Sequence, residues 1–157
     1  MYKMSSYVGE EIQVKVALIT DQHFGGKSDS QSFNEYIEKF YTNQFFPYLK
    51  ENNIDTVIDL GDTFDRRKYV NFAILDKVRK YYFDVLWQNN IKLHSIVGNH
   101  STYYRNTNNV NSSFLLYGHY NNVNVYPAAH TLTLDGTDID LIPWINSENY
   151  SSSNDDG

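Results

Sequence analysis

The sequence comprises 157 residues, of which 41% are hydrophobic, and it carries a formal net charge of −6. This length is enough for one domain with a buried core, whereas the negative charge excludes a protein that coats nucleic acid through an overall basic surface. Cysteine is absent, which excludes disulfides and thiolate metal sites. No apolar run approaches the length of a membrane span or the core of a signal peptide, so we expect a cytosolic chain with no membrane partner.

The first two thirds of the sequence predict alternating strands and helices. Residues 14–20 (VKVALIT) are a short β-branched apolar run typical of a buried strand, and a polar loop with two glycines follows. Apolar residues recur every three or four positions over 33–49, which indicates an amphipathic helix that Pro47 should kink or interrupt. A second strand is predicted at 54–60, a second helix at 70–86 and a third strand at 91–97. Connections of this length imply a parallel sheet, and the fold class is therefore α/β.

From residue 110 the pattern changes. A short helix is predicted near 112–120, and NVNVYP, TLTLDG and TDIDLIPW follow it. LDGTDI places a turn between two alternating runs, which indicates a β-hairpin. Residues 1–150 therefore form the predicted domain, and residues 151–157 form a polar tail.

Aromatic residues are unusually frequent, with 14 Tyr and 9 Phe, many of them on the predicted helices. One interpretation is a tyrosine-rich core and surface, because helices that cover a sheet need apolar stripes. The other interpretation is a surface for self-association.

Polar side chains follow each of the three predicted parallel strands. Ligands in such sheets bind beyond the carboxyl ends of the strands. The first strand is followed by DQH, the second by GDTFD and the third by GNH, which place there Asp21, His23, Asp62, Asp65, Asn99 and His100. Gly61 and Gly98 precede two of these groups and should let the backbone turn sharply.

Each of these short motifs alone has an ordinary explanation, since an aspartate after a strand is often a helix N-cap and a histidine after a glycine is often part of a turn. Asp21 and Asp62 are 41 residues apart, and Asp62 and Asn99 are 37 apart, which corresponds to one strand–helix unit in each case. Three motifs in this order are not explained as caps. Their mixture of oxygen and nitrogen donors suits Mn²⁺, Fe²⁺, Mg²⁺ or Zn²⁺.

The order D-x-H, G-D-x-x-D, G-N-H resembles the calcineurin-like metallophosphoesterases. Within them, VIDLGDTFDRRKYVNF, HSIVGNHSTYYRNTN and IDLIPWINSENY are similar to the nuclease subunit of tailed-phage recombination endonucleases, the phage relatives of the SbcD-type repair nucleases. The resemblance runs from about residue 14 to residue 150 and covers the first part of a longer family protein. It implies a truncated α/β/β/α sandwich in which a mostly parallel sheet is followed by a hairpin toward the second sheet.

The resemblance also implies a site with two metal ions, most simply Mn²⁺. Asp62 would bridge the ions, Asp21 and His23 would bind the first, and Asn99 would bind the second. His100 would stabilise the scissile phosphate or protonate the leaving oxygen, and Asp65 would orient the His100 imidazole.

The chain departs from the family pattern in two ways. Ser101 stands where the family carries an acidic residue, and this removes an acceptor around the metals. The family supplies three further histidines from later motifs, whereas the remaining histidines here have other interpretations: His94 packs in a strand, His119 is not a ligand and His130 lies in a loop. We therefore expect this polypeptide alone to bind one ion weakly and to hydrolyse DNA poorly, as the product of a truncated or interrupted gene would.

Basic and aromatic residues next to these motifs are candidates for DNA contact. Arg66, Arg67 and Lys68 either form a solvated helix-start cluster paired with carboxylates or contact the DNA backbone. Tyr103, Tyr104 and Arg105 are candidates to stack on or hold an unpaired strand.

Three functional interpretations stay open. The first is part of a metal-dependent DNA exonuclease or endonuclease in recombination and repair, in the host cytoplasm if the gene is a phage gene. The second is another calcineurin-like phosphoesterase, and the third is a non-catalytic remnant that keeps the fold and self-associates. The resemblance implies a homodimer for the intact nuclease and a coiled-coil repair ATPase as its partner, although the segment that binds this ATPase should lie beyond Gly157.

Overall fold

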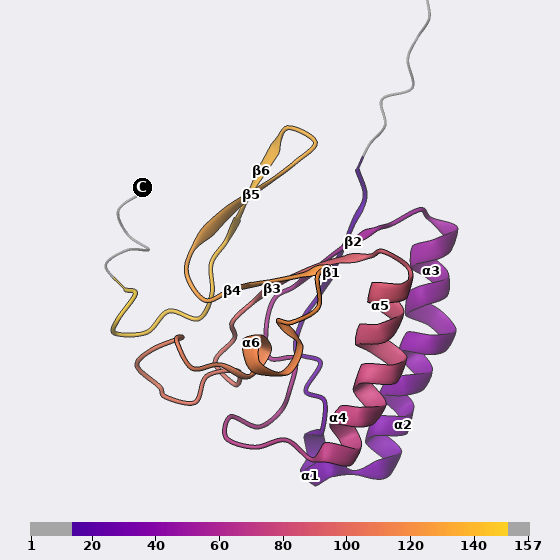
Figure 1. Cartoon of the computed structure of the whole chain (residues 1–157), viewed down its shortest axis with the longest axis horizontal. Coiled ribbons are helices and arrows are strands. Elements are labelled where there is room, and N and C mark those ends of the chain that lie inside the picture. Colours follow the sequence, from indigo (N-terminus) through magenta and orange to yellow (C-terminus); the bar gives the residue numbers. More distant parts are fainter. Residues whose placement is uncertain (1–13, 151–157) are drawn as a thin grey trace, which may run out of the picture.

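The computed structural model describes residues 14–150, so the predicted tail at 151–157 lies outside the described residues. A parallel sheet in the order β1-β2-β3-β4 forms its centre (Figure 1). The strands are β1 (Val16–Ile19), β2 (Thr56–Asp59), β3 (Lys92–Ile96) and β4 (Val123–Tyr126). The three predicted strands are confirmed with shorter bounds, and β4 lies in the NVNVYP stretch. All four carboxyl ends meet at one edge of the sheet.

Each predicted amphipathic helix is a run of three helical segments with a π-helical turn in the middle. The first run is α2 (Gln31–Phe40), η1 (Tyr41–Phe45) and α3 (Phe46–Glu51), and the second is α4 (Phe72–Val78), η2 (Arg79–Phe83) and α5 (Asp84–Gln88). The α-helical pattern is interrupted directly before Pro47, as expected for a residue without an N–H group. The glycine-containing loop ends in α1 (Gly26–Asp29), which is a turn with left-handed backbone at Lys27 and Ser28.

The aromatic stripes of the two helical runs belong to the core. Helices α2 to α5 cover one face of the sheet (Figure 1). Tyr41, Leu49 and Tyr82 are buried there against Val57 and Leu93 of the sheet. The interpretation as core residues is therefore the one that the structure supports for these stripes.

A hairpin lies on the other side of the sheet. It consists of β5 (His130–Leu134) and β6 (Thr137–Leu141), with positive φ at Asp135 and Gly136 in the turn, as the LDGTDI pattern predicts. Leu141 of the hairpin is buried with Ile58 and Ile96 of the sheet. The short helix α6 (Ser112–Tyr117) precedes β4. The α/β fold class is confirmed, and no helix within residues 14–150 is long and apolar enough to cross a membrane.

Candidate metal centre and catalytic site

The loops that follow β1 and β2 run side by side and are paired through their backbones. The N–H groups of Asp21 and His23 donate to the carbonyls of Gly61 and Asp62, at 3.1 and 3.0 Å. This pairing fixes the register in which Asp21 and His23 approach Asp62. All three residues have positive φ, between 46° and 56°, a left-handed conformation that costs about 1 kcal/mol or more per residue. The same conformation occurs at other non-glycine residues of the described chain, such as Asn53 and Asn90, so it is not confined to the candidate ligands.

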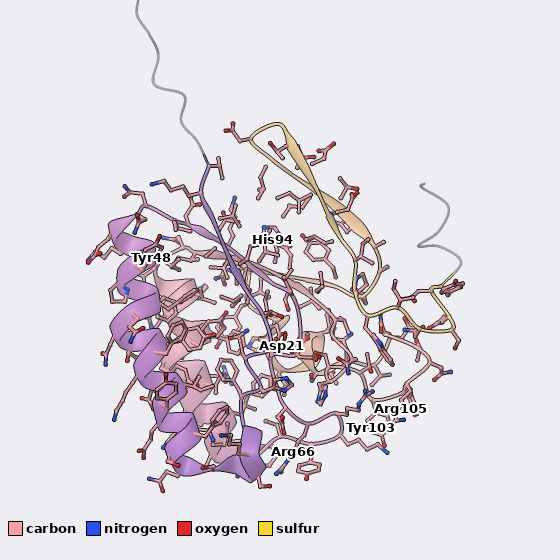
Figure 2. All side chains as sticks on the ribbon, turned by 180° about the vertical axis from the view of Figure 1, so that it is seen from behind. Asp21, Tyr48, Arg66, His94, Tyr103 and Arg105 are labelled. Carbon is pink, nitrogen blue, oxygen red and sulfur yellow. The ribbon has the colours of Figure 1, made fainter. Side chains whose placement is uncertain are left out.

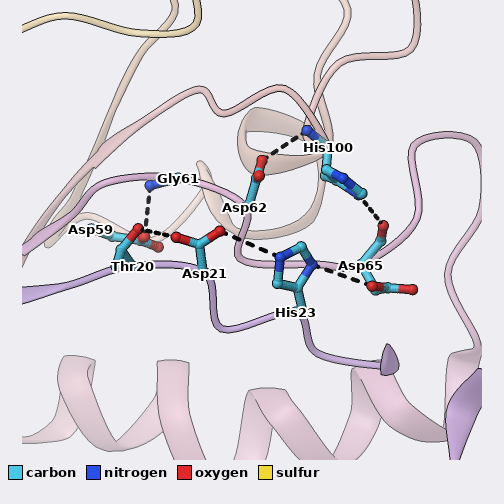
Figure 3. Close-up of polar contacts among 8 residues, drawn as sticks. All are labelled: Thr20, Asp21, His23, Asp59, Gly61, Asp62, Asp65 and His100. Atoms are coloured by element: carbon cyan, nitrogen blue, oxygen red, sulfur yellow. Dashed lines mark hydrogen bonds and ion pairs between the residues drawn. The ribbon is translucent and has the colours of Figure 1, made fainter. Parts of the chain in front are cut away.

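Asp21, His23 and Asp62 form a group of potential metal ligands (Figure 3). Asp21 Oδ1 lies 3.4 Å from His23 Nε2, and one donor atom from each of the three residues lies within 4.8 Å of the others. Two carboxylates and one imidazole are a donor set that divalent transition metals accept. The residues present therefore fit a divalent cation.

The third loop meets Asp62 through the backbone. The N–H group of His100 donates to Asp62 Oδ1 at 2.7 Å, which fixes one carboxylate oxygen. Gly61 has φ +100°, so the turn there needs glycine, as predicted. Gly98 has no positive φ, and its role is different from the predicted turn: its backbone packs directly against Gly61 and Asp62. Asn99 follows Gly98 at the same edge of the sheet and is half-buried.

The imidazole of His100 is oriented by Asp65, but not by the carboxylate that the sequence suggested. His100 Nδ1 lies 2.7 Å from the backbone carbonyl oxygen of Asp65. Since a carbonyl only accepts, Nδ1 carries the proton and Nε2 is the nitrogen available to a substrate. The Asp65 carboxylate instead lies 3.2 Å from Nδ1 of His23. Metal-binding histidines usually donate the N–H of their second ring nitrogen to a carboxylate, a backbone carbonyl or water, and the Asp65 carboxylate is the group near that nitrogen here.

A buried polar network beneath the ligand loops was missed in the sequence. Asp59, at the end of β2, is completely buried and accepts hydrogen bonds from Gln22, Gly61 and Thr63. Burial raises the pKa of Asp59 to about 7, although these hydrogen bonds counteract the effect. The sequence feature that could have indicated this network is Asp59 itself, a charged residue near the end of the predicted strand IDTVIDL.

The basic cluster after Asp65 lies in a loop and not at a helix start, because α4 begins only at Phe72 with Asn71 as its N-cap. Arg66 forms an ion pair with Asp29 at 3.0 Å, and its guanidinium lies over the ring of Tyr69. The other two cations are also engaged: Arg67 donates to Thr102 at 3.3 Å and lies over Trp144, while Lys68 lies over Tyr103.

Tyr103, Tyr104 and Arg105 are exposed on the loop that follows the third motif. The rings of Tyr103 and Tyr104 meet edge to face, with 4.8 Å between their centroids. In Figure 2, Asp21 lies near the middle of the molecule, Arg66, Tyr103 and Arg105 lie below it, and Tyr48 lies by the helix on the left.

Among residues 14–150, His94, His119 and His130 belong to no group of candidate metal ligands. His94 is buried and lies 2.8 Å from the Tyr126 hydroxyl, as expected for a packed histidine, and burial lowers its pKa. His119 is exposed beyond α6. His130 is the first residue of β5 and not a loop residue, and it stacks on Tyr126. Ser101 is fully buried beneath the loop.

A parallel sheet that gathers carboxylates and imidazoles at its carboxyl edge is the architecture of a metal-dependent hydrolase. The family model for the calcineurin-like phosphoesterase matches residues 14–156, and the chain belongs to this family of metal-dependent enzymes.

The chain is 38% identical over 136 residues to exonuclease subunit 1 of Enterobacteria phage T4, a match that covers 87% of this chain and 40% of that protein. The chain thus spans less than half the length of this relative. Among solved structures, the nuclease MPE of Pseudomonas putida matches with a TM-score of 0.49 and 23% identity, over 76% of this chain and 50% of that one.

Proposed function

We propose that this domain takes part in the metal-dependent hydrolysis of phosphodiester bonds in DNA, as part of an exonuclease or endonuclease of recombination and repair in the cytoplasm. The observation that carries the proposal is the approach of Asp21, His23, Asp62 and His100 at the carboxyl edge of one sheet. The likeness to a protein named as an exonuclease subunit supports DNA as substrate and a further subunit as partner.

In this proposal each residue has a distinct task. Asp21, His23 and Asp62 would hold the first ion, and Asp62 with Asn99 would hold the second. Mn²⁺ is the proposed metal, and Mg²⁺, Fe²⁺ and Zn²⁺ are the alternatives. Such ions supply Lewis acidity and an activated water. His100 presents Nε2 to the scissile phosphate or the leaving oxygen, because its Nδ1 is bound to Asp65.

DNA contact is assigned to the loops beside this edge. Tyr104 and Arg105 are exposed, so they are free to stack on a base or bind a phosphate without breaking a core contact. Arg66 and Arg67 would have to exchange their intramolecular partners for phosphate.

The donors in this chain favour weak activity. Within residues 14–150, Asp62 and Asn99 are the two ligands proposed for the second ion, so we expect one weakly bound ion and slow hydrolysis by this polypeptide alone. The same deficit favours, as a second candidate, a non-catalytic module that retains the fold.

We further propose a homodimer, formed through an apolar surface beside the loops and not through the buried helical stripes. A groove of about 320 Å³ lies between the loop before α4 and helix α6. Exposed apolar side chains line it, namely Tyr69, Phe72, Val110 and Leu115. If Phe72→Ser together with Leu115→Ser leaves the sedimentation coefficient unchanged, this surface is not the interface.

The central experiment measures hydrolysis of linear duplex DNA by the purified chain with Mn²⁺, against a chelated control and the variant Asp62→Asn. Slow hydrolysis that requires both Mn²⁺ and Asp62 supports the proposal. Mn²⁺ binding with no hydrolysis supports the non-catalytic candidate. Faster hydrolysis of an aryl phosphodiester or a phosphopeptide than of DNA would point to another phosphoesterase of the family.

A further inference from the structure

One fully buried carboxylate, Asp59, contacts both loops that carry the candidate metal ligands. Its Oδ1 accepts from the N–H of Gly61 at 3.0 Å (Figure 3), and its Oδ2 accepts from Gln22 Nε2 at 2.9 Å and from the Thr63 hydroxyl at 2.7 Å. Side chains of this type are almost never fully buried unless they are paired or hydrogen-bonded.

The three donors to Asp59 flank the candidate ligands in the sequence. Gln22 lies between Asp21 and His23, while Gly61 and Thr63 stand on either side of Asp62. A shift of either loop would therefore stretch a hydrogen bond to the same buried carboxylate. If the carboxylate were removed, each of the three donors would lose its acceptor, and a buried donor without an acceptor lowers stability. The shared acceptor therefore couples the position of one loop to that of the other.

The network continues into both sides of the core. The hydroxyl of Tyr41, in the π-helical turn η1, donates to Gln22 Oε1 at 2.6 Å. On the other side, the hydroxyls of Thr63 and Tyr117 lie 2.9 Å apart, and Ser95 lies 3.1 Å from Tyr117. Tyr41 and Tyr117 are themselves buried, so the loops are held against fixed groups.

We propose that Asp59 is a positioning residue of the metal centre, which holds Asp21, His23 and Asp62 together before a metal ion binds. The proposal rests on the proposed function only in that the ligand group binds a divalent cation. Asp59 touches neither the cation nor the substrate in this arrangement, and it acts through Gln22, Gly61 and Thr63.

The chemistry of the network predicts different effects for two substitutions. Asp59→Leu removes every acceptor and keeps a similar volume. Asp59→Asn keeps one acceptor for Gly61, and its amide N–H groups can donate to Gln22 and Thr63 once the Gln22 amide and the Thr63 hydroxyl rotate. The rotated Gln22 then donates to the Tyr41 hydroxyl. The conservative variant should therefore restore what the apolar variant loses.

The test measures Mn²⁺ affinity of the folded chain by calorimetry and amide hydrogen exchange of the metal-free chain. We expect Asp59→Leu to lower the affinity about tenfold and Asp59→Asn to leave it within about twofold, on the scale of groups that orient metal ligands. Amides of Gly61, Asp21 and His23 should exchange faster in Asp59→Leu, relative to the amides of β3. Val57→Ala is the matched control, because Val57 is fully buried on the same strand and face, but its apolar side chain accepts no hydrogen bond from the ligand loops.

The outcomes separate this proposal from the proposed function. If the unmodified chain binds no Mn²⁺, the proposed function fails, and the exchange rates alone decide on Asp59. Unchanged affinity and unchanged loop exchange in Asp59→Leu would overturn the positioning role, as would an equal loss of affinity in Val57→Ala. If Asp59→Leu does not fold, Thr63→Val replaces it: an affinity loss of about threefold supports the role, and unchanged affinity overturns it.

Discussion

Gly98 packs so closely against Asp62 that a single methyl group on Gly98 would lie 2.6 Å from the Asp62 backbone nitrogen and closer still to the carboxylate. Gly98 follows β3, and because it has no side chain it leaves room for the candidate ligand Asp62, which follows β2. The Asp62 carboxylate in turn accepts a hydrogen bond from the backbone N–H of His100. The two strand ends therefore form one unit.

Gly98→Ala should displace Asp62 and weaken Mn²⁺ binding more than tenfold, with a loss of about 1–3 kcal/mol in the free energy of unfolding from overpacking. Calorimetry and urea unfolding measure the two effects. Gly136→Ala is the control, since Gly136 has φ +75° with nothing near its would-be Cβ, and it should cost stability alone. Unchanged Mn²⁺ binding in Gly98→Ala would contradict the packing argument.

His100→Gln should lower hydrolysis by at least about 100-fold while Mn²⁺ affinity stays unchanged, because Asp62 is bound by the His100 backbone and not its ring. The comparison of DNA with an activated aryl phosphodiester identifies the step. A loss on DNA alone assigns protonation of the leaving oxygen, whereas a loss on both substrates assigns stabilisation of the phosphate. His119→Gln, at an exposed position, serves as the control, and loss of Mn²⁺ affinity in His100→Gln would refute this role.

Asp65→Asn should reduce Mn²⁺ affinity about tenfold, because the Asp65 carboxylate lies against Nδ1 of the candidate ligand His23. The Asp65 carbonyl that orients His100 remains in this variant. The exposed Asp76→Asn provides a matched removal of one negative charge. Should hydrolysis fall while affinity is retained, the carboxylate would serve His100, as the sequence pattern suggested.

The strands and the convergence of their ends could be predicted because they depend on local patterns. An apolar run such as 91–97 indicates a strand by itself, and helical connections require parallel strands whose carboxyl ends meet. This reasoning brings Asp21, Asp62 and His100 to one edge without any knowledge of side-chain contacts.

The remaining features depend on contacts between distant atoms. Whether the carboxylate or the carbonyl of Asp65 reaches His100 is decided by loop conformations that no periodicity encodes. Gly98 resembles a turn glycine in the sequence, yet its requirement comes from the approach of Asp62. The sequence places Asp59 in a strand but does not show which face of the sheet its side chain points to. Both faces of this sheet are covered, so the pattern of apolar residues does not indicate where the hydrogen-bond donors to Asp59 lie.

The stability of the metal-free chain should depend on pH through Asp59. Its pKa is about 7 in the folded chain against 3.8 as the reference value, so the folded chain binds the proton more tightly. This stabilisation is complete below pH 3.8 and is lost as pH rises to 7, which amounts to roughly 4 kcal/mol at about 1.4 kcal/mol per pH unit.

Urea unfolding of the unmodified chain and of Asp59→Asn between pH 4 and 8, with a chelator present, measures this effect. The difference between the two chains isolates Asp59, because the other titrating groups are shared. The free energy of unfolding of the unmodified chain should fall relative to that of the variant as pH rises through this range. Parallel curves would show that Asp59 does not titrate there.

Arg105→Ala should weaken DNA binding and reduce the slope of log K against log salt by about one, which corresponds to the loss of one phosphate contact. Arg66→Ala should change this slope less, because the guanidinium is already engaged by Asp29 and Tyr69, and it should instead lower stability by up to about 1 kcal/mol. Fluorescence anisotropy with labelled DNA at several salt concentrations, in the presence of Ca²⁺ to avoid cleavage, measures both slopes. A larger change for Arg66→Ala than for Arg105→Ala would reverse the assignment and place the DNA backbone against the loop before α4.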